Sequence, residues 1–247
     1  MADRAHQGYT YPDIAKMIDH SLLNPALTTA ELDEGCHLAR QYDVASVCIL
    51  PYYAARCAEL LKGSTVQPST TIGFPHGAHT TAVKLAEVER ALKDGAVELD
   101  MVINISKARS GDWDYVRNEI AALTRAVHGG NAKIKVIFEN AYQDDAAKIR
   151  LCEICGEIGV DWVKTSTGYA PSGAILADLR LMRKYSPPGV QVKAAGGIRT
   201  LDALLEVRAV GVTRVGATRT SAMLEECRER LGMPALAVGE LRATGGY

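Results

Sequence analysis

The sequence has no block of like charges and almost no net charge. Its 28 Lys and Arg residues stand against 29 Asp and Glu residues, which gives a formal net charge of −1. Nucleic-acid-binding proteins more often carry a basic excess, so we expect no nucleic-acid partner. No stretch approaches the ~20 apolar residues of a membrane span, and the polar segment 1–10 lacks the apolar core of a signal peptide. These absences predict no membrane partner.

The sequence also lacks the cysteine pattern of a disulfide-rich protein. Six cysteines are scattered along the chain: Cys36, Cys48, Cys57, Cys152, Cys155 and Cys227. Cys152 and Cys155 have the spacing of a redox motif, but they lie inside a predicted helix, where two thiols are more often small core side chains. A reduced, cytoplasmic protein is therefore expected.

Metal-ligand spacing is weak throughout. No second Cys-x-x-Cys pair follows Cys155, and no spaced histidine pair does either, so a zinc site has little support. His76 and His79 lie in a turn with no carboxylate nearby in sequence, which is a poor metal set. We expect no metal and no cofactor.

The element pattern predicts a single (β/α)8 barrel over residues 1–247, with a short extension at 1–10 and a tail at 232–247. No linker rich in Pro, Gly or Ser divides the chain, and 47% of its residues are hydrophobic. Eight β-rich segments alternate with amphipathic helical ones: 17–22, 45–50, 70–74, 97–104, 134–140, 161–166, 190–195 and 213–216. An open doubly wound sheet is the alternative, but residues 19–24 hold no glycine for its phosphate loop.

Helix boundaries follow from capping residues. Helix starts are expected at Thr28, which forms a capping box with Glu31, and at Ser172 and Thr200. Helix ends are expected at Gly95, Gly159 and Gly211.

Carboxylates inside apolar strands point to chemistry, because a barrel's reactive groups lie at the C-terminal ends of its strands. In the fourth predicted strand, alternation separates Asp100 from the apolar Leu99 and Met101, so Asp100 is expected to face the barrel interior. In the fifth strand Lys135 and Glu139 share one side. For Glu139 alone, an end-capping or ion-paired role is as well supported as a functional one.

Two lysines give the sharper signal. Lys164 lies late in the sixth predicted strand and Lys193 late in the seventh, 29 residues apart, so they are expected to be neighbours on adjacent parallel strands. Burying an ammonium group is unfavourable, and two adjacent lysines should each depress the other's pKa and produce an amine nucleophile. The alternative is two lysines that reach a phosphate or Glu139 without covalent chemistry.

Glycines in the last two βα loops predict a phosphate site. Gly196 and Gly197 precede Arg199, and Gly216 precedes Arg219, each just before a predicted helix. Loops after strands seven and eight of this barrel, backed by helix N-termini, commonly bind phosphate. Together with the two lysines, they indicate a phosphorylated small molecule and carbonyl chemistry.

At this point the sequence resembles a known family, the deoxyribose-phosphate aldolases, from about residue 14 to 224. The resemblance rests on segments 18–23, 46–48, 72–77, 98–105, 135–139, 163–168 and 192–200. It implies a class I, metal-independent lyase on a (β/α)8 barrel, often dimeric. The implied reaction is the reversible cleavage of 2-deoxy-D-ribose 5-phosphate to acetaldehyde and D-glyceraldehyde 3-phosphate through a lysine Schiff base, a step of deoxyribose phosphate catabolism.

The resemblance also implies residue roles. Lys164 forms the imine, Lys193 is the cation that lowers its pKa, and Asp100 relays protons with an ordered water. The implied substrate- and phosphate-binding residues are Asp19, Thr165, Gly168, Gly196, Gly197, Arg199, Gly216, Thr218 and Arg219. Tyr247 is a candidate helper of proton transfer, or a chain end without a role.

The sequence departs from the family pattern at several positions. Asn24 and Leu50 stand where the family commonly has lysine and asparagine before proline, and Tyr169 differs from the usual residue after Gly168. Thr218-Arg219 replaces a common Ser-Ser pair, so Arg219 either binds phosphate, points to solvent or alters the substrate. Another imine-forming aldolase, a phosphosugar isomerase and a non-catalytic phosphosugar-binding protein on the same barrel are the alternative functions.

Overall fold

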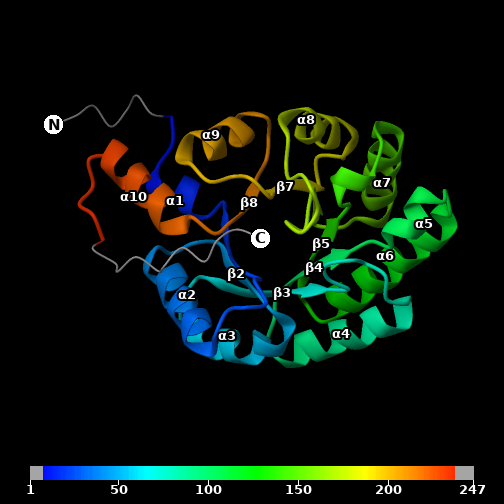
Figure 1. Ribbon diagram of the computed structural model, residues 1–247, viewed down its shortest axis with the longest axis horizontal. Coiled ribbons are helices and arrows are strands. Elements are labelled where there is room, and N and C mark those ends of the chain that lie inside the picture. The colour runs from blue at the N-terminus through cyan, green and yellow to red at the C-terminus, as the bar shows by residue number, and fades with distance from the viewer. Residues whose placement is uncertain (1–7, 237–247) are drawn as a thin grey trace.

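The computed structural model describes residues 8–236, and its eight strands form a closed barrel in sequence order (Figure 1). Every neighbouring pair is parallel, including β8 with β1. The strands are β1 Ile18–Leu22, β2 Ser46–Ile49, β3 Gln67–Ile72, β4 Glu98–Val102, β5 Lys133–Ile137, β6 Trp162–Lys164, β7 Gln191–Ala195 and β8 Arg214–Ala217. The predicted (β/α)8 barrel is confirmed, and the third strand begins three residues earlier than expected.

Helices surround the strands (Figure 1). They are α1 Tyr11–Ala15, α2 Thr29–Gln41, α3 Ala54–Leu61, α4 Thr81–Lys93, α5 Ile105–Arg109, α6 Trp113–Gly129, α7 Asp145–Ile158, α8 Leu176–Tyr185, α9 Leu201–Ala209 and α10 Thr220–Arg230, with 3₁₀ turns η1 Pro51–Tyr53 and η2 Asn140–Tyr142. Among the described residues, no helix is long and apolar enough to cross a membrane.

The capping residues act largely as predicted. Thr28 forms its capping box with Glu31, and Thr200 accepts a hydrogen bond from the backbone N–H of Ala203. Gly159 ends α7 in the left-handed conformation, which glycine adopts without steric penalty.

The helix start predicted at Ser172 is wrong, because α8 begins four residues later at Leu176. The intervening segment is bound to the end of β7. The backbone N–H of Ala174 donates to the carbonyls of Ala195 and Gly196, both at 3.0 Å. The segment 171–175 therefore belongs to the loops above the barrel.

Strand alternation separates an apolar shell from a charged interior. Leu99 and Met101 are fully buried in the hydrophobic core that joins the strands to the helices. Asp100, between them in sequence, is also fully buried but contacts lysines of β5, β6 and β7. The inward orientation predicted for Asp100 is confirmed.

Candidate active site

Lys164 and Lys193 are direct neighbours across β6 and β7, as the sequence predicts. Both side chains are buried, and both Nζ atoms lie 2.7 Å from the same oxygen of Asp100, Oδ2. Lys193 also pairs with Oδ2 of Asp19 at 2.5 Å. Two amines and two carboxylates from four strands therefore meet inside the barrel.

A second group of charges, which the sequence analysis did not assign to the site, lies beside the first. Lys135 pairs with Oδ1 of Asp100 at 2.8 Å and with Glu98 at 2.6 Å. Arg214 pairs with Glu98 and with Asp19. Strand alternation puts Glu98 on the same face of β4 as Asp100 and Lys135 on the corresponding face of β5, whereas nothing in the sequence pointed to Arg214.

The two lysines differ in electrostatics. Burial lowers the pKa of Lys164, and the neighbouring Lys193 lowers it further, against the opposing effect of Asp100. For Lys193, burial also acts to lower the pKa, but the carboxylates of Asp100 and Asp19 outweigh it and raise the pKa. The pKa of Lys193 is therefore raised overall, because two carboxylates contact it.

Asp100 is held as a carboxylate. Burial alone would raise its pKa, but Lys135, Lys164 and Lys193 together hold the pKa well below its ordinary value. Asp100 can therefore accept a proton from one amine and return it, while the other cations keep its charge compensated.

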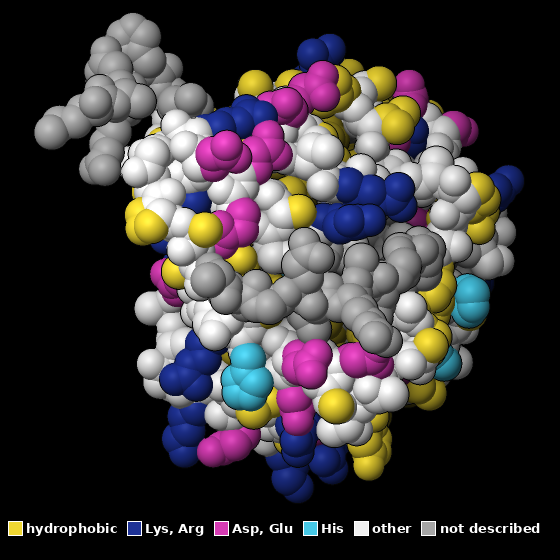
Figure 2. All heavy atoms as spheres, turned by 60° about the vertical axis from the view of Figure 1, so that its left-hand side comes forward, with side chains coloured by type: hydrophobic (Ala, Val, Ile, Leu, Met, Phe, Trp, Pro, Cys, Tyr) yellow, Lys and Arg dark blue, Asp and Glu magenta, His cyan; other side chains and the backbone are white. Residues whose placement is uncertain are grey.

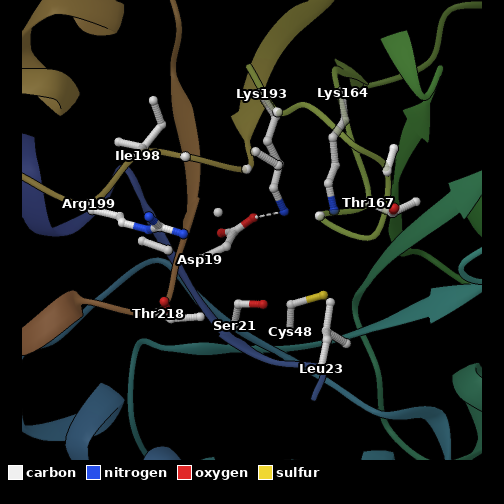
Figure 3. Close-up of a pocket in the computed structure, with 18 of the residues that line it drawn as sticks. Asp19, Ser21, Leu23, Cys48, Lys164, Thr167, Lys193, Ile198, Arg199 and Thr218 are labelled. Carbon is white, nitrogen blue, oxygen red and sulfur yellow. Dashed lines mark ion pairs between the residues drawn. The ribbon is translucent and has the colours of Figure 1, made fainter. Parts of the chain in front are cut away.

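A cavity of about 240 Å³ opens above the lysines (Figure 3). Lys164 and Lys193 point into it from β6 and β7, and Asp19 and Cys48 line it from β1 and β2. The reactive amines therefore meet solvent-accessible space on one side only. Burial raises the pKa of the Cys48 thiol, which disfavours its thiolate.

The cavity is also lined by backbone and by hydroxyl and guanidinium groups. Gly168, Gly196, Gly197, Arg199, Gly216 and Thr218 all line it. Gly168, Gly196 and Gly197 have positive φ angles of 96°, 82° and 89°. Consecutive glycines in this conformation leave backbone N–H groups free of side-chain cover, as anion sites require.

Two of the predicted substrate-binding residues, Thr165 and Arg219, do not line the cavity. Thr165 is buried, and its hydroxyl bridges the backbone of Ala195, so it joins β6 to β7. Arg219 is the exposed residue that precedes α10 and is not among the residues that line the cavity. Tyr247 lies outside the described residues.

Glu139 supports the loop after β6. Its backbone has a left-handed φ of 53°, and its side chain is buried. The carboxylate accepts hydrogen bonds from the backbone N–H of Thr167, at 3.1 Å, and from the Thr167 hydroxyl. The sequence leaves open an end-capping or a functional role for Glu139, and these hydrogen bonds are those of an end-capping carboxylate.

Tyr169 connects three loops at the rim. Its ring meets Phe74 edge-on at 5.5 Å between centroids, and its hydroxyl donates to the carbonyl of Leu23 at 2.7 Å. The residue that departs from the family pattern therefore ties the loops after β1, β3 and β6 together.

On the face shown in Figure 2, acidic and basic side chains are interspersed. Within residues 8–236, no group of three or more His, Cys, Asp or Glu side chains is arranged to hold a metal ion. Cys152 and Cys155 are buried, free thiols inside α7.

Comparison with known proteins agrees with this site. A model of the DeoC/LacD family of aldolases matches residues 14–218. A deoxyribose-phosphate aldolase of Rhodopirellula baltica is 62% identical over 241 residues, which cover 97% of this chain and 99% of that protein. The structure of an aldolase called QR15 has a TM-score of 0.84 at 34% identity and covers 88% of this chain and 97% of its own. A tetrameric deoxyribose phosphate aldolase of Aeropyrum pernix has a TM-score of 0.83 at 28% identity, with coverage of 90% and 93%.

Proposed function

The chain belongs to the DeoC/LacD aldolase family, and we propose that it is a class I aldolase acting on 2-deoxy-D-ribose 5-phosphate. The reaction is reversible cleavage to acetaldehyde and D-glyceraldehyde 3-phosphate. The observation that carries the proposal is the placement of Lys164. This buried lysine has a lowered pKa, points into the cavity and contacts the ionised Asp100.

Lys164 acts as the nucleophile. Its neutral amine adds to the aldehyde carbon of the open-chain sugar, and the carbinolamine loses water to give a protonated imine. The C3 hydroxyl then gives up its proton, the C2–C3 bond breaks and its electron pair enters the imine, which becomes an enamine. D-glyceraldehyde 3-phosphate leaves. The enamine takes a proton on carbon, and water hydrolyses the resulting imine to acetaldehyde and the free amine.

Asp100 and Lys193 support these proton transfers. Asp100 contacts both amines, so it can take a proton from Lys164 as the carbinolamine forms. Positioned general acid–base groups contribute about 10²–10⁴-fold to such steps. Lys193 stays charged and holds Asp100 in place. Asp19 binds the sugar end of the substrate.

The phosphate binds at the glycine-lined end of the cavity. The backbone N–H groups of Gly168, Gly196, Gly197 and Gly216 are donors for its oxygens. Arg199 and the Thr218 hydroxyl line the same end and add charge and a further donor (Figure 3). We assign Thr165 a supporting role and Arg219 an outer, electrostatic one.

Imine trapping tests the proposal. The protein is incubated with acetaldehyde and sodium borohydride, and the reduced adduct is mapped by mass spectrometry. We expect one ethyl group on Lys164. Modification elsewhere, or none, would contradict the assignment and favour a non-catalytic phosphosugar-binding protein.

A substrate assay separates the remaining alternatives. Release of acetaldehyde from 2-deoxy-D-ribose 5-phosphate is expected. Conversion of a phosphosugar without release of an aldehyde would indicate an isomerase. Aldol addition of acetaldehyde only to an acceptor aldehyde other than D-glyceraldehyde 3-phosphate would indicate another imine-forming aldolase.

Assembly and location are part of the proposal. We propose a homodimer, to be tested by light scattering at several protein concentrations; the tetramer named for the Aeropyrum pernix relative is the alternative. We also propose a cytoplasmic location, which the six free, buried cysteines support.

A further inference from the structure

The barrel interior holds one more cation than carboxylates. The cations are Lys135, Lys164, Lys193 and Arg214, and the carboxylates are Asp19, Glu98 and Asp100. All seven side chains come from strands of the barrel, and none is more than 11% exposed. If every group were ionised, this cluster would carry a net charge of +1 away from bulk water.

Around this ion-paired cluster, the neighbouring side chains of β2 and β3 add no charge, and Glu139 beyond β5 adds one carboxylate. On β2, Cys48 is a thiol whose pKa is raised by burial, and Ser46 donates its hydroxyl to Asp19. On β3, the positions beside Glu98 and Asp100 hold Ser69 and Thr71. Glu139, two residues beyond β5, accepts hydrogen bonds from Thr167 and forms no ion pair with a lysine, although Lys164 acts on its carboxylate electrostatically.

The contacts decide which cation gives up a proton. Arginine does not deprotonate in proteins. Lys135 lies within ion-pair distance of all three carboxylates, the longest contact being 3.6 Å to Asp19. Lys193 contacts two carboxylates. Lys164 has a single contact, to an oxygen of Asp100 that Lys193 also uses.

Arg214 keeps its charge at every working pH, so the cluster always has fewer carboxylates than cations. One of its nitrogens lies 2.6 Å from Oδ1 of Asp19 and 2.9 Å from Oε2 of Glu98, and the other lies 3.1 Å from Oε1 of Glu98. Its guanidinium lies over the ring of Trp162, 4.9 Å from the centroid. Arg214 thus binds two of the three carboxylates, Asp19 and Glu98. The third, Asp100, is shared by Lys164 and Lys193.

We propose that Arg214 is a positioning residue for catalysis: as the fixed surplus cation of the barrel interior, it keeps the amine of Lys164 unprotonated. Arg214 is not among the residues that line the cavity and acts through the carboxylates it binds. The inference rests on the proposed imine chemistry of Lys164 and adds the residue that sets its protonation.

The expected size follows from distance. Lys193 is the register partner of both Lys164 and Arg214, so two strand spacings, or about 10 Å, separate the outer strands. At an effective dielectric constant of about 20, one charge at that distance shifts a titration by about 1 pH unit. Removing the Arg214 guanidinium also frees Asp19 and Glu98 to pair more fully with Lys193 and Lys135. Asp100 is then more available to Lys164, which raises the pKa of Lys164 further.

The test measures how trapping at Lys164 depends on pH in charge variants. Initial rates of borohydride trapping with acetaldehyde are recorded from pH 5 to 10, with the site confirmed by mass spectrometry. Arg214→Met should move the rising limb about 1 unit higher, with about tenfold slower trapping below it. Arg214→Lys, which keeps the charge, should stay near the native profile.

Two more variants keep the test decisive if Arg214→Met does not fold. Glu98→Gln raises the surplus to two charges and should move the limb lower. The double variant Arg214→Met/Glu98→Gln removes one charge of each sign, restores a surplus of one and should return the limb toward its native position. Shifts in the same direction for Glu98→Gln and Arg214→Met would overturn the proposal. So would an unshifted limb in Glu98→Gln, or a double variant whose limb differs from the native one as much as that of Glu98→Gln does.

The native protein separates the two levels of inference. If native protein gives no adduct at Lys164, the proposed function fails. If native protein is trapped at Lys164 but the charge variants do not shift the limb as stated, only the role of Arg214 fails.

Discussion

Among the described residues, buried lysines lie both outside and inside the barrel, and only the barrel interior opens onto the cavity. Outside the barrel, Lys84 of α4 pairs with Glu119 of α6 at 2.9 Å, and both side chains are fully buried. Inside the barrel, Lys164 shares one oxygen of Asp100 with Lys193. Burial lowers the pKa of Lys84 as it lowers that of Lys164. A lowered lysine pKa therefore does not by itself identify a nucleophile.

Access and charge balance separate the two places. Lys84 meets one carboxylate, donates to the carbonyl of Val102 at 2.8 Å and is 0% exposed. Its stem packs against Gly73, where a Cβ would lie 2.7 Å from Cε of Lys84. This balanced pair fixes the turn after β3. The interior cluster has a surplus cation and an amine at a cavity wall, which is what carbonyl addition requires.

The largest expected difference concerns activity. Lys164→Met should lower kcat/KM for 2-deoxy-D-ribose 5-phosphate by at least about 10⁴-fold, because removal of a covalent nucleophile leaves only binding and polarisation. Lys84→Met, assayed at a temperature where it is folded, should stay within about fivefold of the native value. Steady-state kinetics and borohydride trapping check both. A comparable loss in Lys84→Met would mean that the outer pair also serves the chemistry.

Lys84→Met should lower the unfolding free energy more than Lys164→Met does, the reverse of their order in activity. Lys84→Met leaves Glu119 buried without its partner, and breaking a buried ion pair in this way costs about 3–5 kcal/mol of unfolding free energy. Replacing both residues, as in Lys84→Met/Glu119→Leu, should recover most of that loss. Urea unfolding followed by circular dichroism measures it. Equal stability of single and double variants would show that the pairing itself contributes nothing.

The sequence predicts the site better than it predicts the electrostatics of the site. Strand alternation and the spacing of one βαβ unit place Asp100, Lys164 and Lys193 together, since these depend on local periodicity and on a regular barrel. The raised pKa of Lys193 depends on which carboxylates surround it, and one of them, Asp19, comes from a strand 174 residues away. No local pattern carries that information.

The missed helix start has a similar cause. Ser172 has a suitable side chain for a cap, but the backbone of 171–175 bonds to the end of β7 and so joins the rim of the cavity. Arg214 was missed because no local pattern in the short last strand shows that Asp19, 195 residues away in sequence, lies beside it.

A third buried group, without any ionic partner, extends the comparison to pH. His20, on β1, is 3% exposed, and within residues 8–236 its ring bonds only the Thr220 hydroxyl, at 2.8 Å. Burial lowers its pKa to about 4, below the ~6.5 of an unfolded chain. Between these values the unfolded chain binds the extra proton, so stability falls as pH drops through this range.

The expected loss from His20 is about 2 kcal/mol between pH 7 and pH 5. His20→Gln, which cannot take up a proton, should flatten the stability profile over this range. Chemical denaturation at several pH values checks it, with His79→Gln as the exposed control. An unchanged slope in His20→Gln would show that another group causes the acid sensitivity.

The smallest effect is expected where the charges are exposed, since solvent screens them. Arg199 lines the phosphate end of the cavity, whereas Arg219 precedes α10 outside it. Arg199→Leu should therefore raise KM for 2-deoxy-D-ribose 5-phosphate about tenfold, the loss of one charge-assisted contact, with kcat little changed. Arg219→Ser should raise KM about twofold, and that rise should vanish in about 0.5 M salt, because a more distant charge acts only through the screened field.

Inhibition by inorganic phosphate, which binds without reacting, should rank the two variants in the same order. A larger, salt-resistant effect of Arg219→Ser would place that guanidinium on the phosphate and make the departure from the family's Ser-Ser pair a determinant of substrate binding.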